Sequence, residues 1–206
     1  MKDPAFAKLV LFVNSAVPLA LLGWDAYWHQ LGTNPINFAL RTAGMCALIF
    51  LTVTLMVTPA RLITGWNFLS HFRRQLGLWA FAYGMIHLTL YFVFDKSLDL
   101  SSAINDIVKR PFILFGMTGL LLMMPLAITS TNGMIKRLGA ARWKRLHKLV
   151  YVSALAGAYH FYLSVKSDHR MPNVFIAVII TLLAYRALAG RVSFLRRTRK
   201  PAALAR

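Results

Sequence analysis

The chain has 206 residues, of which 58% are hydrophobic, with a mean hydropathy of +0.56 and a formal net charge of +18. Soluble globular domains contain about 45–50% apolar residues, so this composition excludes an ordinary soluble domain and indicates a membrane protein. The basic residues flank apolar segments, a pattern that favours membrane topology and anionic lipid over nucleic-acid binding.

Six apolar segments approach or exceed the about 18–20 helical residues that cross a bilayer: 7–24, 42–60, 76–94, 111–129, 148–165 and 172–190. The sequence therefore predicts an all-α fold, a polytopic membrane bundle of six transmembrane helices. Residues 1–190 form the predicted membrane domain, and residues 191–206 a basic cytoplasmic tail.

The first segment could also be read as a secretory signal peptide. It is longer than a typical signal core and runs into Trp24, Tyr27 and Trp28 instead of a small-residue cleavage site. We therefore expect a retained helix. With a cytoplasmic N-terminus and six spans, most of the 24 Lys and Arg residues lie on the cytoplasmic side, and five of the six aspartates lie outside. The positive-inside rule then predicts both termini in the cytoplasm.

The second segment contains the single cysteine, Cys46, which cannot form an internal disulfide and is expected to be a small buried apolar residue. The sequence has no CxxCH motif, no iron–sulfur spacing, no GxGxxG and no P-loop. Any haem is therefore not attached in the usual c-type manner, and no nucleotide-binding domain is recognisable.

Histidines in apolar segments are the main functional signal, because a titratable ring in hydrocarbon needs a partner. His87 lies in the third segment, His160 in the fifth, and His147 at the inner edge of the fifth. His87 is about 16 Å into its helix and His160 about 20 Å beyond His147, so both are expected at a similar depth in the outer half of the bilayer. Paired imidazoles on neighbouring helices favour haem iron as their partner.

Small residues recur at helical spacing before both histidines: Gly77, Ala80 and Gly84 in the third segment, and Ser153, Ala156 and Gly157 in the fifth. Such stripes either leave room for a flat macrocycle or let helices pack closely. His147 and His160 lie about 140° apart around an ideal helix. His147 could therefore serve a second, inner haem, a flavin or a quinone, or lie at the interface without a ligand.

Other candidates are weaker. His71 is a possible inner partner of His147, whereas His29 and His169 are expected in solvent-exposed outer loops. Arg41 could neutralise a haem propionate or anchor its helix at the headgroups. Five residues of the inner face could contact a flavin or a quinone, or be interfacial anchors only: Arg73, Arg74, Trp79, Trp143 and Arg145.

Short motifs within about residues 40–190 match a known family in order and spacing: RTAG (41–44), TPAR (58–61), RRQLGLWAF (73–81), HLTLY (87–91), KRPF (109–112), AITST (127–131), WKRLHKLVY (143–151) and HFYLSVK (160–166). The chain resembles the MsrQ (YedZ) family, the haem-binding membrane subunits of the bacterial periplasmic protein-methionine-sulfoxide reductase system. That family belongs with the ferric reductase-like transmembrane domains.

This resemblance implies that His87, His147 and His160 are the haem-associated histidines, and that the cofactors are haem b and flavin mononucleotide (FMN). It also implies a bacterial inner membrane location and electrons from the quinone pool or a cytoplasmic flavin reductase. The implied partner is a periplasmic molybdopterin-containing reductase that repairs methionine sulfoxide in oxidised proteins.

The leading hypothesis is a transmembrane electron-transfer subunit whose catalytic site for methionine sulfoxide lies in the partner. The alternative is a ferric reductase-like, metal-reducing cytochrome b, although fused ferric reductases carry two histidines in each of two helices and a dehydrogenase domain. A transporter is disfavoured, because glutamate is absent and no aspartate lies at the centre of a segment. A non-redox assembly scaffold would make the histidines dispensable.

Overall fold

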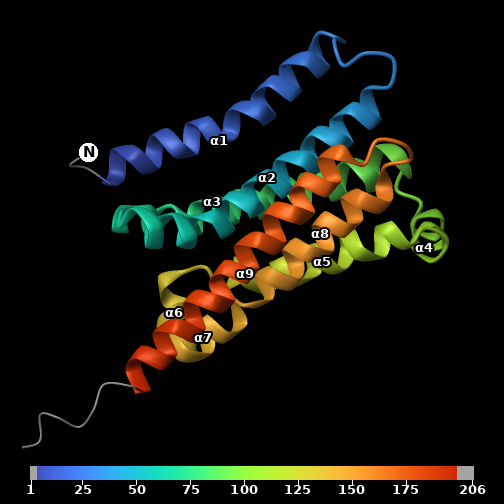
Figure 1. The fold of residues 1–206 in the computed structure, drawn as a ribbon. Helices are drawn as coiled ribbons and strands as arrows, with labels where there is room; N and C mark the ends of the chain where they lie inside the picture. The colour runs from blue at the N-terminus through green and yellow to red at the C-terminus, as the bar shows by residue number, and fades with distance from the viewer. Residues whose placement is uncertain (1–3, 199–206) are drawn as a thin grey trace, which may run out of the picture.

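The computed structural model describes residues 4–198, which form helices joined by short turns (Figure 1). The long helices are α1 (Pro4–Tyr27), α2 (Pro35–Thr64), α3 (Arg73–Leu90), α5 (Pro111–Ile128), α8 (Leu149–Ser164) and α9 (Arg170–Thr198). The short ones are the 3-10 helix η1 (Asn67–His71), the π-helix η2 (Tyr91–Asp95), α4 (Leu100–Lys109), α6 (Asn132–Leu138) and α7 (Ala140–Leu146). The predicted all-α class is confirmed over this part of the chain.

Five helical stretches among the described residues are long and apolar enough to cross a membrane: α1, α2, α3 continued into η2, α5, and α9 as far as Ala189. Helix α8 has only 16 residues, about 24 Å of helix, which is shorter than a hydrocarbon core of about 30 Å. The chain is therefore a multi-pass membrane protein, but the predicted sixth span is not confirmed by length. Helix α9 continues to Thr198, so the predicted tail begins as helix, and residues 199–206 lie outside the described part.

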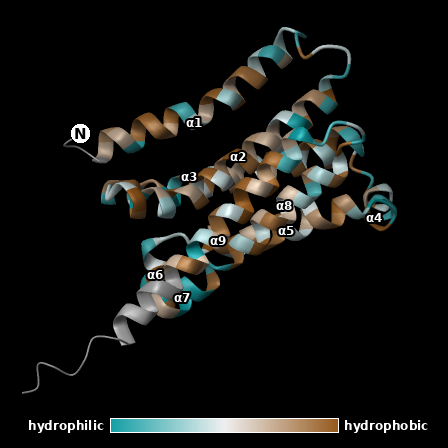
Figure 2. Cartoon of the chain, in the orientation of Figure 1, coloured by the Kyte–Doolittle hydropathy of each residue, from teal (hydrophilic) through white to brown (hydrophobic). Residues whose placement is uncertain are grey.

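The outer surface of the bundle is apolar. Large hydrophobic side chains are exposed on several long helices, including Phe12, Ile49, Leu121 and Ile180. Hydrophobic residues run along the long helices, while hydrophilic ones gather at the turns and around α4 (Figure 2). An apolar surface of this extent is stable only against lipid.

Local chemistry sets the ends of α2. The Asn34 side chain accepts the Asn37 N–H at 3.1 Å, and Pro35 occupies the first turn, where its missing N–H removes no helical hydrogen bond. Gly65 ends the helix in a left-handed conformation, with φ of 75°. The helix continues past Pro59 and begins at Pro35, so α2 extends beyond the predicted segment 42–60 at both ends.

Two helix pairs form the centre of the fold: α2 packs against α3, and α5 against α8. The sequence shows no convincing internal repeat, yet the two pairs are alike: in each, a helix that carries a histidine (α3 with His87, α8 with His160) packs against a helix that has none. Their shared core includes the fully buried Leu55, Ala80 and Ala154, together with Ile179 of α9. Helix α1 joins through α3, where the Tyr83 hydroxyl donates to the Ser15 carbonyl at 2.8 Å.

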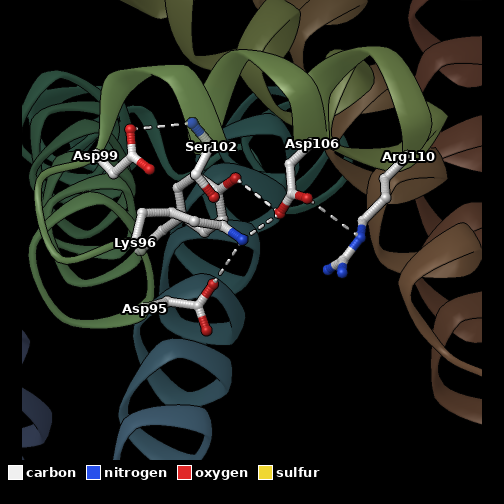
Figure 3. A network of polar contacts seen from close by, with 7 residues as sticks. Asp95, Lys96, Asp99, Ser102, Asp106 and Arg110 are labelled. Atoms are coloured by element: carbon white, nitrogen blue, oxygen red, sulfur yellow. Dashed lines mark hydrogen bonds and ion pairs between the residues drawn. The ribbon is translucent and has the colours of Figure 1, made fainter.

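Polar contacts fix the end of the bundle that carries α4 (Figure 3). Asp106 of α4 pairs with Lys96, and its other oxygen lies 3.6 Å from Arg110 Nε. The hydrogen bond from Lys96 holds the pKa of Asp106 below its usual range. Asp99 caps α4 by accepting the Ser102 N–H at 3.2 Å. These contacts join the end of η2 to the start of α5.

Candidate functional site

Two imidazoles from different helix pairs meet inside the bundle. His87 of α3 and His160 of α8 have ring centroids 6.0 Å apart and ring planes at 81°. Two imidazole nitrogens that bind one metal ion at about 2 Å each place their ring centroids roughly 6 Å apart. The separation therefore fits one metal ion between the rings.

Each ring is held through its Nδ1 atom. His87 Nδ1 lies 2.9 Å from the Leu40 carbonyl oxygen of α2, and His160 Nδ1 lies 2.6 Å from the Phe112 carbonyl oxygen of α5. A carbonyl oxygen only accepts hydrogen bonds, so Nδ1 carries the proton and donates it in both rings. The Nε2 atom of each neutral ring then keeps a lone pair, which is the form in which histidine binds a metal.

A glycine opposes each ring. A Cβ atom on Gly44 of α2 would lie 3.0 Å from Nδ1 and 3.1 Å from Cε1 of His87. A Cβ atom on Gly116 of α5 would lie 2.7 Å and 2.9 Å from the same atoms of His160. Each ring therefore occupies space that the side chain of any larger residue at position 44 or 116 would fill.

These features fit haem better than a bare ion. Among the described residues, no group of three or more His, Cys, Asp or Glu side chains gathers to hold a metal ion. Two imidazoles alone would leave a bare ion short of ligands, whereas haem iron brings four nitrogen ligands of its own and needs only axial partners.

The small residues that precede His160 have a packing role. Ser153 donates its hydroxyl to the Gly119 carbonyl, and a Cβ atom on Gly119 would lie 3.6 Å from the Gly157 backbone nitrogen. The close-packing interpretation of this stripe therefore describes the contact between α5 and α8.

His147 lies at the opposite end of α8, beside α7. Its ring stacks on Trp143 with centroids 3.8 Å apart, and its Nε2 lies 3.1 Å from the Thr129 hydroxyl. That hydroxyl donates to the Pro125 carbonyl at 2.6 Å, so it accepts a hydrogen bond from His147 Nε2–H. His147 is thus protonated at Nε2, whereas His87 and His160 are protonated at Nδ1.

Burial, followed by the charges of Arg73 and Arg74, lowers the pKa of His147 from 6.5 to about 4. The ring is therefore neutral at physiological pH.

A cavity of about 300 Å³ opens beside His147. Arg73 and Arg74 of α3 and Trp143 of α7 line it, and apolar side chains such as Met123 line the remainder. A second cavity, of about 680 Å³, is bordered by Arg74, His71 and Trp79. Guanidinium groups beside aromatic rings suit a planar ligand that carries an anionic or carbonyl group.

The remaining predicted residues lie outside these clusters. His71 is exposed, and its Nδ1 lies 3.0 Å from the Phe68 carbonyl oxygen; it borders the second cavity, whereas His147 lines the first. Arg41 is exposed next to Leu40, and Arg145 is exposed on α7 and lines neither cavity.

Two sequence expectations need correction, and one holds. His29 is exposed, as predicted. His169 is only partly exposed, because its ring packs 4.7 Å from Tyr162, and its Nδ1 is buried without a hydrogen-bond partner. Cys46 is half-buried rather than buried, because it lies on a less enclosed face of α2.

Sequence reasoning missed three features of this region. It matched Gly44 only as part of a motif and did not single out Gly116, although each begins a Gly-Met pair at nearly the same separation from its histidine. It also did not single out Arg186 among the basic residues. Arg186 donates to the Leu55 carbonyl at 2.6 Å and to the Tyr151 hydroxyl at 3.1 Å, linking α9 to α2 and α8.

Comparison with known proteins gives consistent results. A family model described as ferric reductase like transmembrane component matches residues 42–158, which include His87 and His147. The chain is 47% identical over 174 residues to the protein-methionine-sulfoxide reductase heme-binding subunit MsrQ of Caulobacter vibrioides, covering 84% of this chain and 83% of that relative.

Proteins of the same name from two other bacteria are similarly related. The one from Herminiimonas arsenicoxydans is 44% identical over 181 residues, covering 87% of this chain and 83% of that protein. The one from Brucella ovis is 46% identical over 193 residues, covering 94% of this chain and 85% of that protein.

Proposed function

Because the chain belongs to the MsrQ family of ferric reductase-like membrane proteins, we propose that it transfers electrons across a membrane through a b-type haem held by His87 and His160. The observation that carries this proposal is the pair of neighbouring imidazoles, whose ring centroids are 6.0 Å apart. Both rings have Nδ1 engaged by a carbonyl and Nε2 available to bind iron.

We propose six membrane crossings in a bacterial inner membrane, with α8 as the short one and both termini in the cytoplasm. Helix α8 packs against α5 and α9, which supports a spanning role despite its length. Helices α6 and α7 carry five basic residues and no acidic ones, which by the positive-inside rule supports a cytoplasmic position for their end of the bundle. The α4 end then faces the periplasm, and residues 191–206 form the cytoplasmic tail.

The residues of the site would act by ligation and orientation. His87 and His160 would supply their Nε2 atoms to the haem iron, and the Leu40 and Phe112 carbonyls would hold the Nδ1 protons in place. A hydrogen bond from Nδ1–H to a carbonyl pulls the proton partly away from the ring, which raises the electron density of the imidazole, would make Nε2 a stronger donor and would favour oxidised iron. The bound haem supplies a reversible one-electron couple. Arg41, exposed beside Leu40, is our candidate for neutralising a propionate.

We propose that electrons arrive at the cavity beside His147, from FMN, a quinone or a cytoplasmic flavin reductase that docks there. Arg73 and Arg74 offer charged donors for a phosphate or a quinone carbonyl, and Trp143 and His147 offer flat surfaces for an aromatic ring. The cavity volume of about 300 Å³ is at the lower end for small-molecule sites. Trp79, in the second cavity, and Arg145, on the exposed face of α7, would contribute to docking.

The proposed acceptor is a periplasmic molybdopterin-containing methionine sulfoxide reductase, which would hold the catalytic site. The MsrQ relatives are named as heme-binding subunits of a protein-methionine-sulfoxide reductase, and this similarity supports a methionine sulfoxide reductase as the acceptor. A ferric reductase-like activity is the second candidate, because the ferric reductase family model covers more than half of the chain.

Vesicles containing the purified protein and an enclosed reductant test this function. We expect haem-dependent transfer to the outside, where the methionine sulfoxide reductase partner turns over peptide methionine sulfoxide. Ferric citrate should be reduced much more slowly than the partner. Rapid ferric reduction with no transfer to the partner would support the second candidate, and no transfer to either acceptor would reject both.

A further inference from the structure

The environments of His87 and His160 repeat one motif of three parts. In each, the imidazole Nδ1 contacts a carbonyl on the partner helix, at Leu40 for His87 and Phe112 for His160. In each, the residue four positions after that carbonyl is a glycine, whose missing side chain leaves the space that the ring fills.

The geometry of an α-helix explains why the glycine falls at this position. A helical side chain points back toward the N-terminus and covers the turn before its own Cα. The side chain at position i+4 therefore covers the carbonyl of residue i, which already accepts the N–H of residue i+4. Only glycine leaves that carbonyl open to a second donor from the side. Gly44 and Gly116 thus expose the carbonyls of Leu40 and Phe112.

We propose that Gly44 and Gly116 are positioning residues for the two haem ligands, acting through the carbonyls they uncover to fix the tautomer and the plane of each ring. The proposal rests on the proposed function, because it requires that His87 and His160 bind haem iron. Each hydrogen bond from Nδ1–H to its carbonyl restricts rotation of the imidazole about the bond from Nε2 to the iron. The two ring planes therefore stay at the 81° found between them.

Replacing either glycine by alanine should therefore change the haem. The new Cβ would contact the ring and cover the carbonyl. This would weaken the hydrogen bond from Nδ1–H to the carbonyl and so lower the donor strength of Nε2. We expect the midpoint potential to rise and the angle between ring planes to change. Gly116→Ala should have the larger effect, because its Cβ would lie 2.7 Å from the ring, against 3.0 Å for Gly44→Ala.

The experiment measures the midpoint potential and the electron paramagnetic resonance (EPR) spectrum of the purified haem protein for each variant. Gly119→Ala is the matched control, since a Cβ there would lie 3.3 Å from the Ser153 carbonyl and contact no histidine. It should lower thermal stability while leaving both haem signals at their wild-type values. Gly23→Ala, inside α1 where a Cβ would have nothing within 4 Å, should leave both haem signals unchanged without lowering stability.

A measurement on wild-type protein covers the case in which the variants fail to fold. In protein labelled with ¹⁵N-histidine, nuclear magnetic resonance should show His87 and His160 as Nδ1-protonated tautomers, even without haem. Protons on Nε2, or unchanged potentials and spectra in folded Gly44→Ala and Gly116→Ala, would overturn the inference. A finding that His87 and His160 do not bind haem in the wild-type protein would instead reject the proposed function.

Discussion

Replacing either His87 or His160 by alanine is expected to lower haem content at least about tenfold. Removing a residue that only hydrogen-bonds to a metal ligand lowers metal affinity about 10–100-fold, and removing the ligand itself must cost more. The two rings come from separate helix pairs and have centroids 6.0 Å apart. Each substitution therefore leaves the iron with one protein ligand and leaves the space of the lost ring open. The measurement is haem per protein by pyridine haemochrome, with the reduced-minus-oxidised spectrum recorded alongside.

His29→Ala is the matched control for this prediction, because His29 is exposed in the turn after α1. It should retain wild-type haem content. Thermal unfolding of the haem-free proteins should show that His87→Ala and His160→Ala remain folded. Full haem content in both site variants would show that neither ring is a ligand.

Replacing Arg74 or His147 by alanine is expected to slow haem reduction by the physiological donor while leaving haem content intact. For Arg74, loss of a hydrogen bond from a charged group costs about 1.5–3 kcal/mol, which corresponds to roughly a 10–100-fold weaker donor affinity. Both residues line the cavity of about 300 Å³. His147→Ala also removes the ring that stacks on Trp143.

The measurement compares the rate of haem reduction by reduced FMN or a quinol with the rate with dithionite, a small reductant that needs no site. Arg142→Ala is the control, because Arg142 is exposed on α7 and lines neither cavity. Equal slowing with dithionite would indicate damage to the haem site. Unchanged donor rates in Arg74→Ala and His147→Ala would remove the cavity from the electron path.

The sequence was sufficient to predict the helical class and the meeting of His87 with His160, because hydropathy fixes the segments and helix rise fixes depth. It did not give the exact ends of α8, which is one residue shorter at each end than the predicted segment 148–165 and stops where Val165 takes an extended backbone. Nor could spacing along one helix reveal Gly44 and Gly116. Their role depends on pairing between helices, which no single segment encodes.

His147 shows the same limit from another side. Its offset from His160 indicated that the two rings face different ways, but not what His147 contacts. The structure shows a stack on Trp143 and a hydrogen bond to Thr129, both set by the turns around α6 and α7. Tertiary contacts of this kind separate the three histidines into a facing pair and a ring at the opposite end.

EPR of the oxidised wild-type protein is the most direct test of the account. Two axial imidazoles with nearly perpendicular planes leave two iron d orbitals close in energy, which gives a strongly anisotropic low-spin signal. The 81° between the rings of His87 and His160 predicts such a signal, and predicts its loss in either alanine variant. A high-spin signal, or a low-spin signal that survives in both variants, would contradict ligation of one iron by this pair.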